Sequence, residues 1–152
     1  MSVKSTRAPD THLLEPIRLL GCLTIENEPI SVSLARQFTK IALRAGGYGS
    51  EADTLVLAAS ELVTNAIVHS RTVPARPIHV RLMTKGPTTI RLEVHDSETQ
   101  PPRRQPVNVH DESGRGLALV EALTTRWGVH LNGADKFVWC ELETKGQGVE
   151  HR

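Results

Sequence analysis

The sequence predicts an α+β fold, a two-layer α/β sandwich in which a mixed, mostly antiparallel sheet carries helices on one face. Segments with apolar residues at every second position follow one another across short turns, which is typical of antiparallel strands. Segments with apolar residues at helical spacing lie between these groups of strands. Helices and strands do not alternate one by one along the chain. A doubly wound parallel sheet is therefore not expected.

The size and composition of the chain indicate one globular domain. The chain has 152 residues, of which 39% are hydrophobic and 23% charged, enough for a single core. We expect a flexible arm at 1–15, a domain at 16–144 and a tail at 145–152, because both ends are polar and lack periodicity. No apolar run reaches the about 18 residues of a membrane span, and no signal peptide is visible, so a cytoplasmic protein is expected.

Charge, cysteines and histidines exclude several classes of site. The formal charge of +1 gives no large basic field, so direct binding to nucleic acid is not expected. Cys22 and Cys140 are isolated in apolar contexts, and we expect both to be buried thiols. The histidines show no HExxH or paired-cysteine spacing, so the sequence predicts no zinc site.

The first two elements are a strand and an amphipathic helix. Alternation over 17–25 predicts a strand whose buried side carries Ile17, Leu19, Gly21, Leu23 and Ile25. After Pro29, helical spacing predicts a helix that Gly46-Gly47 stops. Its expected buried face consists of Leu34, Ala35, Phe38, Ile41, Ala42 and Ala45. Its expected outer face consists of Arg36, Gln37, Lys40 and Arg44.

The stretch from Ser50 to His69 predicts a helix of about five turns, with Ser50 and Asp53 as a capping-box-like start. Glu61 and Asn65 lie one turn apart on the polar edge of this helix. A carboxylate and an amide in this arrangement can share Mg²⁺ with a phosphate chain, because both are oxygen donors. The same spacing is common in a solvated helix edge, so this pattern alone leaves both interpretations open.

The remaining elements are a hairpin, a long loop, a helix and a closing strand pair. Alternation predicts strands at 78–83 and 90–95 with one buried face, and the second strand delivers Asp96 at its end. The loop 97–113 contains three prolines and is expected to be a lid. Gly114-Arg115-Gly116-Leu117 then opens a helix to about residue 126, a pattern typical of a phosphate-binding turn or of a simple hinge. Strands at 127–131 and 136–143, joined by an Asn132-Gly133 turn, complete the sheet.

In this order, the motifs resemble the histidine-kinase-like ATPase superfamily, which includes gyrase, histidine kinases and mismatch-repair ATPases. The segments SELVTNAIVHS, VHDSETQPP and GRGLALVEALTTRWGV are more specifically similar to a branch of stand-alone anti-sigma factors and serine-protein kinases that is abundant in actinobacteria. The resemblance spans about residues 17–143. A histidine-bearing helical hairpin upstream, as in a sensor kinase, is not visible in the sequence.

The resemblance implies ATP and Mg²⁺ as cofactors and assigns roles to individual residues. Asn65 is expected to hold Mg²⁺ against the phosphates, Glu61 to act as the general base, and Asp96 to accept the adenine amino group. Further nucleotide-binding residues are expected to be Gly114, Arg115, Gly116 and Leu117. Glu98 stands where the family usually has glycine, and its charge is expected to weaken the affinity for a polyanionic ligand.

The resemblance also implies two alternative functions. The first is an ATP-binding anti-sigma regulatory factor with serine/threonine protein kinase activity toward an anti-anti-sigma partner. The second is a non-catalytic partner-binding module with a weak or decayed nucleotide site. In either case the expected partners are an anti-anti-sigma protein and a sigma factor, bound through the helix that carries Arg36, Lys40 and Arg44, with homodimerisation as a further expectation.

Overall fold

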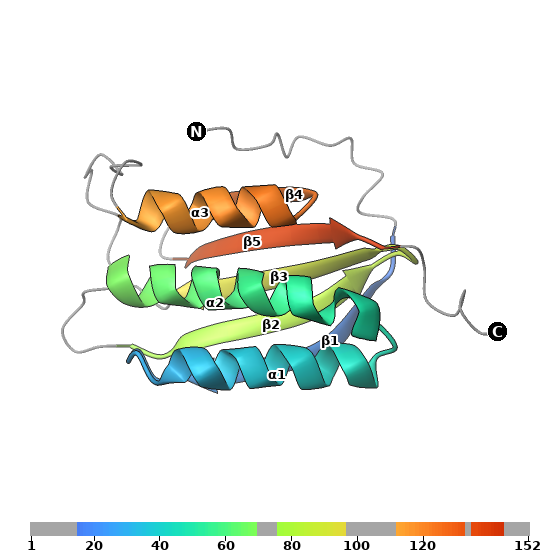
Figure 1. Cartoon of the computed structure of the whole chain (residues 1–152), viewed down its shortest axis with the longest axis horizontal. Helices are drawn as coiled ribbons and strands as arrows, with labels where there is room; N and C mark the ends of the chain where they lie inside the picture. The colour runs from blue at the N-terminus through green and yellow to red at the C-terminus, as the bar shows by residue number, and fades with distance from the viewer. Residues whose placement is uncertain (1–14, 70–75, 97–111, 133–134, 145–152) are drawn as a thin grey trace.

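The computed structural model describes residues 15–69, 76–96, 112–132 and 135–144. It confirms the α+β fold: in these segments, three α-helices cover one face of a five-stranded sheet (Figure 1). The helical elements are α1 (Ser31–Ala45), the 3₁₀ turn η2 (Gly49–Glu51), α2 (Ala52–His69) and α3 (Glu112–Leu123). The strands are β1 (Ile17–Ile25), β2 (Ile78–Lys85), β3 (Thr89–Asp96), β4 (Arg126–Asn132) and β5 (Asp135–Glu143).

The strand order is β1-β2-β3-β5-β4, and every neighbouring pair is antiparallel. Gly86, with φ +66°, forms the turn of the β2–β3 hairpin in the left-handed region that favours glycine. Residues 1–14 of the predicted arm, most of the lid, Glu98, Gly133 and the tail lie outside the described residues. The domain boundaries therefore stay predictions.

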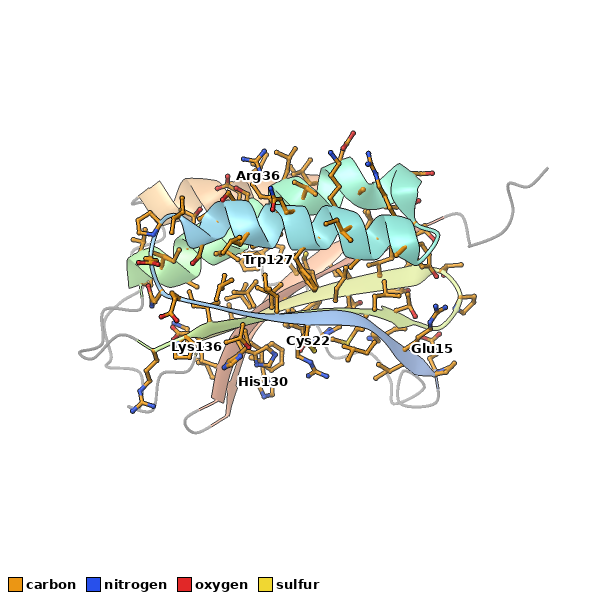
Figure 2. The ribbon with its side chains drawn as sticks, turned by 90° about the horizontal axis from the view of Figure 1, so that it is seen from below. Glu15, Cys22, Arg36, Trp127, His130 and Lys136 are labelled. Atoms are coloured by element: carbon orange, nitrogen blue, oxygen red, sulfur yellow. The ribbon has the colours of Figure 1, made fainter. Side chains whose placement is uncertain are left out.

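The core lies between the helices and one face of the sheet. Small residues on α2, Ala58 and Ala59, are fully buried and let this helix approach the sheet closely. The sheet contributes aliphatic side chains at alternate positions of β2 and β3, which are Ile78, Val80, Leu82, Ile90, Leu92 and Val94. Trp127 of β4 lies in the same layer, between the helices and the sheet (Figure 2).

The prediction for the buried side of β1 is only half correct. The register with β2 shifts between Leu19 and Gly21, so a β-bulge interrupts the alternation. Ile17 and Leu19 are 63% and 51% exposed, whereas Ile25 is buried. A Cβ at Gly21 would lie 2.9 Å from Cε1 of Phe38, so glycine here allows α1 to pack closely on β1.

The predicted faces of α1 are correct only in part. Ala35 is buried, Phe38 and Ala42 pack against the core, and the four polar residues predicted to face outward are exposed. The buried residues are Ser31, Ala35, Thr39 and Leu43, whereas Leu34 and Ile41 are 49% and 67% exposed. Thr39 can be buried because its hydroxyl donates a hydrogen bond of 2.8 Å to the carbonyl oxygen of Ala35. The helix ends as predicted at Gly46-Gly47, where Gly47 adopts φ +91°.

The start of α2 differs from the predicted cap at Ser50. The 3₁₀ turn η2 leads directly into α2. The N-cap residue of η2 is Tyr48, which makes no side-chain capping hydrogen bond. The predicted helix is otherwise confirmed to His69. None of the helices that the structure describes combines the length and apolarity needed to cross a membrane.

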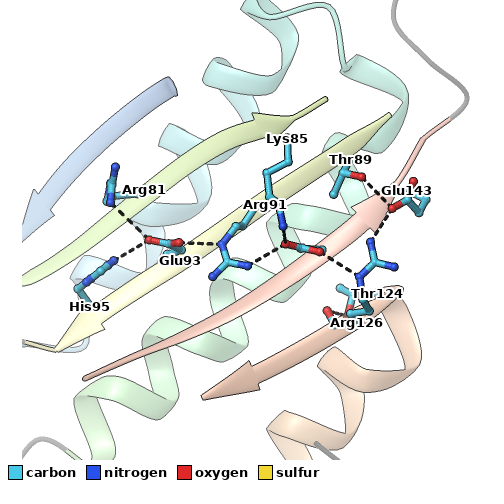
Figure 3. A network of polar contacts seen from close by, with 10 residues as sticks. Arg81, Lys85, Thr89, Arg91, Glu93, His95, Thr124, Arg126 and Glu143 are labelled. Atoms are coloured by element: carbon cyan, nitrogen blue, oxygen red, sulfur yellow. Dashed lines mark hydrogen bonds and ion pairs between the residues drawn. The ribbon is translucent and has the colours of Figure 1, made fainter. Parts of the chain in front are cut away.

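The face of the sheet opposite the helices carries a network of ion pairs (Figure 3). Glu141 is only 2% exposed, and its carboxylate accepts hydrogen bonds from Lys85 Nζ at 2.9 Å, Arg91 Nη1 at 2.8 Å and Arg126 Nε at 3.0 Å. Burial alone would raise the pKa of Glu141, but these three cations outweigh it and hold the pKa at about 2. The network thus covers the sheet face on which none of the described helices lies (Figure 3).

Glu93 forms the second centre of this network. It is 6% exposed and accepts hydrogen bonds from Arg91 Nε at 2.7 Å and His95 Nε2 at 2.8 Å. Burial opposes ionisation here too, yet the hydrogen bonds from His95 and Arg91 lower the pKa of Glu93 to about 2. The buried acidic side chain corrects the prediction that the β2–β3 hairpin has only one buried face.

The two cysteines differ from each other. Cys140 is fully buried as predicted, and burial raises the pKa of its thiol to about 12. Cys22 is exposed, which contradicts the prediction. It lies opposite Arg81 in the register and points to the face away from the helices, like His130 (Figure 2).

Candidate functional site

Three of the segments that carry candidate residues meet at one end of the molecule. The C-terminal end of α2, the end of β3 and the beginning of α3 lie at the same edge of the sandwich (Figure 1). α2 lies between α1 and α3 and packs against both, as well as on β3. The fold therefore brings together Asn65, Asp96 and the first turn of α3, which are far apart in sequence.

Asn65 carries the most informative atom of this region. Its side-chain oxygen Oδ1 is buried and accepts no hydrogen bond from any residue that the structure describes. A buried polar atom without a partner costs about 1–3 kcal/mol, and most such atoms in folded proteins have a partner. An amide oxygen of this kind fits a cation or a ligand donor as its missing partner.

Glu61 lies one turn before Asn65 on the same edge of α2, and its side chain is half-buried. Its neighbours toward the core, Leu62 and Val63, are buried, so this edge separates the core from the surface. A carboxylate at such a position can take a proton from a group bound beside it.

Asp96 ends β3 on the helix-facing side of the sheet. It continues the alternate positions of Leu92 and Val94, which lie in the core, and it is itself only 6% exposed. A buried carboxylate must be hydrogen-bonded, and at the end of a strand it can accept hydrogen bonds from a ligand. The structure therefore agrees with the predicted location of Asp96 at the end of a strand.

The beginning of α3 differs in detail from the prediction. The helix begins at Glu112, so Gly114 and Gly116 lie inside its first turns and do not precede it. The first four backbone N–H groups of a helix have no partner within the helix, and those of Gly114 and Arg115 belong to this set. Leu117 is 9% exposed and belongs to the core, so its side chain has a packing role.

Lys136 was not predicted as a site residue. It lies opposite Asp96 in the register of β3 and β5, and it shares its side of the sheet with Val138 and Cys140. Its alternation with buried residues of β5 is visible in the sequence, but the pairing with Asp96 depends on the sheet order. Lys136 thus adds a positive charge at the same end of the sheet.

No group of three or more histidine, cysteine, aspartate or glutamate side chains in the described segments is arranged to hold a metal ion. A magnesium site of the predicted kind does not need such a group. Mg²⁺ bound to a nucleotide usually keeps several waters and takes one or two protein ligands together with phosphate oxygens. The single amide oxygen of Asn65 fits this coordination.

The sequence profile of the histidine kinase-like ATPase domain matches residues 25–140, which is most of the chain. The chain belongs to this family. Domains of the family bind ATP, typically with Mg²⁺. The match covers Glu61, Asn65, Asp96 and the start of α3.

An uncharacterized protein of Streptomyces coelicolor is similar to this chain. It is 34% identical over 82 residues, which cover 54% of this chain and 78% of that protein. This relative comes from an actinobacterium, and its name describes no activity.

Proposed function

We propose that this histidine kinase-like ATPase domain is an anti-sigma regulatory factor that binds Mg-ATP and phosphorylates a serine or threonine of an anti-anti-sigma partner. It then alternates between that partner and a sigma factor. The family match and the order of the motifs support this proposal, and the relative in Streptomyces is consistent with an actinobacterial branch. The observation that carries it is the buried Oδ1 of Asn65, which has no hydrogen-bond partner among the described residues. It lies at the end of the sandwich where β3 ends in Asp96 and α3 begins (Figure 1).

The residues of this end of the molecule fit ATP and Mg²⁺. Asn65 Oδ1 would bind Mg²⁺, and the buried carboxylate of Asp96 would accept a hydrogen bond from the adenine amino group. The N-terminal N–H groups and the positive end of α3 favour phosphate. When bound, Mg-ATP supplies a transferable phosphoryl group with its charge partly neutralised.

Glu61 is the proposed general base. Its half-buried carboxylate, one turn from Asn65, would orient the hydroxyl group of the partner and accept its proton as the phosphoryl group is transferred. Lys136, opposite Asp96, would add positive charge near a polyanionic ligand. This charge would offset part of the repulsion from Glu98, whose replacement by glycine is expected to increase the affinity for ATP.

A non-catalytic module with the same fold is the second candidate function. It would bind the same partners, but the nucleotide would be structural or absent. The two candidates differ in the role of Glu61, because a module without transferase activity has no use for a general base. Kinase activity therefore distinguishes them directly.

The test uses the purified full chain, labelled ATP with Mg²⁺, and an anti-anti-sigma protein recovered with it from the native cells. Transfer of label to a serine or threonine of that protein, lost in Glu61→Gln and retained in Glu51→Gln, supports the kinase. Binding of ATP and of the partner without transfer leaves the module. No binding of ATP at millimolar concentration contradicts both the kinase and the assignment of Asn65.

The basic row of α1 is the proposed surface for these partners. Arg36, Lys40 and Arg44 are exposed, follow one another at intervals of four residues, and α1 contains no acidic residue. Figure 2 shows Arg36 on the outer side of the helical layer. Exposed charges of this kind mainly set encounter rate and specificity, so Arg36→Glu should slow association with an acidic partner and reduce its salt dependence. Unchanged association rates would exclude this surface.

A further inference from the structure

The sheet face away from the helices carries a row of ring side chains. In the register of the sheet, His79 of β2 lies opposite His95 of β3. Phe137 of β5 lies opposite both His95 and His130 of β4. Figure 2 shows His130 on this face, together with Cys22. Rings from four strands therefore form one row across the sheet.

Three of these rings form a stacked column. The ring centroids of His95 and Phe137 lie 4.4 Å apart with an interplanar angle of 27°. Those of Phe137 and His130 lie 4.6 Å apart with an angle of 22°. His79 is held toward β1 instead, because its Nδ1 lies 3.0 Å from Thr24 Oγ1. Since β1 and β3 lie on opposite sides of β2, this contact draws the His79 ring away from His95.

A pocket of about 340 Å³ lies over β1, β2 and β3 at this point, a volume at the lower end of ligand pockets. The side chains of this face that line it are Cys22, Thr24, His79, Arg81 and His95. We name it the open-face pocket. Phe137 stacks on the His95 ring from the β5 side, so the other side of this ring faces β2 and the pocket. A flat ring in the open-face pocket would therefore extend the stacked column.

Arg81 gives the open-face pocket a positive charge. Its side chain is 45% exposed, and its Nη1 lies 3.6 Å from Glu93 Oε1. Arg91 contacts the same carboxylate at 2.7 Å, so Arg91 neutralises Glu93 more strongly than Arg81 does. Figure 3 shows Arg81 at one end of the ion-pair network. Most of the five N–H donors of the Arg81 guanidinium can therefore serve a ligand.

The charges of the network favour an anion in this pocket. Four cations meet three carboxylates, which leaves an excess of one positive charge when the histidines are counted as neutral. The cations are Arg81, Lys85, Arg91 and Arg126, and the carboxylates are Glu93, Glu141 and Glu143. The described residues that line the pocket include no acidic side chain.

The hydrogen-bond donors of the pocket match a carboxylate. The planar fork of the Arg81 guanidinium can form two parallel hydrogen bonds with the two oxygens of one carboxylate. The tautomer of His79 in which Thr24 donates to Nδ1 carries its proton on Nε2. His79 can therefore donate one more hydrogen bond.

We propose that the open-face pocket binds a small, flat aromatic carboxylate. Its ring stacks on His95, and its carboxylate pairs with Arg81 and accepts a hydrogen bond from His79. The pocket lies on the opposite side of the sheet from the helices that carry Asn65 and Gly114, so it is separate from the proposed nucleotide site. Its occupation does not depend on the proposed kinase activity.

Benzoate is the probe, and nuclear magnetic resonance of the isotope-labelled full chain measures its binding at constant ionic strength. We expect saturable binding with a Kd on the order of 1 mM and shifted signals of Cys22, His79 and His95. Benzamide lacks the charge and should bind about tenfold more weakly, and cyclohexanecarboxylate lacks the flat ring and should bind about threefold more weakly. The absence of saturable benzoate binding, or equal affinity for either comparison compound, would overturn the proposal.

Two further measurements locate the bound benzoate. Arg81→Gln should raise its Kd about tenfold, whereas the matched control Arg18→Gln, at an exposed arginine of β1, should leave it unchanged. In the wild-type chain, benzoate should slow the alkylation of Cys22 by iodoacetamide in proportion to the occupied fraction, because Cys22 lines the pocket. Equal affinity of the two variants, or an unchanged alkylation rate at saturation, would overturn the proposal.

Discussion

Replacing Glu141 by glutamine tests whether the ion-pair network replaces a second layer of helices. In the wild-type chain the Glu141 carboxylate neutralises three cations on the sheet: Lys85, Arg91 and Arg126. Glutamine keeps the size of the side chain but removes its charge, so three half-buried cations would lose their shared counter-ion. Breaking a buried ion pair on one side costs about 3–5 kcal/mol. We therefore expect a loss of about 3–5 kcal/mol in the free energy of unfolding.

Urea denaturation followed by circular dichroism measures this loss, with the same slope expected for both proteins. The matched control is Glu143→Gln, which changes the same type of residue two positions along β5. Glu143 has a side chain that is 40% exposed and pairs with Arg126 at the surface, so its loss should cost less than about 1 kcal/mol. Equal effects of the two substitutions, or a cost below 1 kcal/mol for Glu141→Gln, would refute the interpretation of the network as a buried structural unit.

Three further predictions follow from the sheet. Glu93 and Glu141 have a pKa of about 2 in the folded chain against about 4.5 in the unfolded chain. Their contribution to stability is therefore complete above about pH 5 and is lost as the pH falls toward 2. Acid unfolding monitored by fluorescence should show this loss, on the order of 2–3 kcal/mol for each group. A thiol reagent should label Cys22 in the native chain at once and Cys140 only after unfolding, and equal labelling rates would contradict the observed burial. Gly128→Ala should lower the thermal midpoint, because its Cβ would lie 2.8 Å from the tryptophan ring of β5, and an unchanged midpoint would show that this ring can move.

The elements and their order could be predicted from the sequence because their apolar periods are clear. The α2 helix, the β2–β3 hairpin and the final strand pair follow from local pattern and from turn residues. Asp96 was located correctly because a strand end is a local property. The candidate site could therefore be assembled from motif order, although its residues come from three separate elements.

The faces of α1 and β1 could be predicted only in part, because they depend on tertiary packing. Leu34 and Ile41 have the same helical spacing as a core face, and only the position of α1 above β1 exposes them. Alternation in β1 breaks at a bulge that has no marker other than Gly21. The apolar neighbours of Cys22 in sequence suggested a buried side chain. Cys22 is exposed because it lies on an edge strand and points to the sheet face away from the helices (Figure 2).

The ion-pair network was missed for a similar reason. Glu93 and Glu141 look like ordinary outward residues of alternating strands. Their partners come from five other positions on β2, β3 and β4. The pairing of Lys136 with Asp96 requires the order β3-β5, in which a strand inserts between two that are neighbours in sequence. Such cross-strand pairs become visible only when the sheet register is known.

Calorimetric titration of the full chain with ATP in the presence of Mg²⁺ tests the central claim most directly. The account predicts binding that requires Mg²⁺, is weakened about 10- to 150-fold in Asp96→Asn through loss of one charge-assisted hydrogen bond, and is retained in Glu61→Gln. Equal affinity of the wild-type chain and Asp96→Asn, or no binding at millimolar ATP, would contradict a nucleotide site at the end of the sandwich formed by α2, β3 and α3.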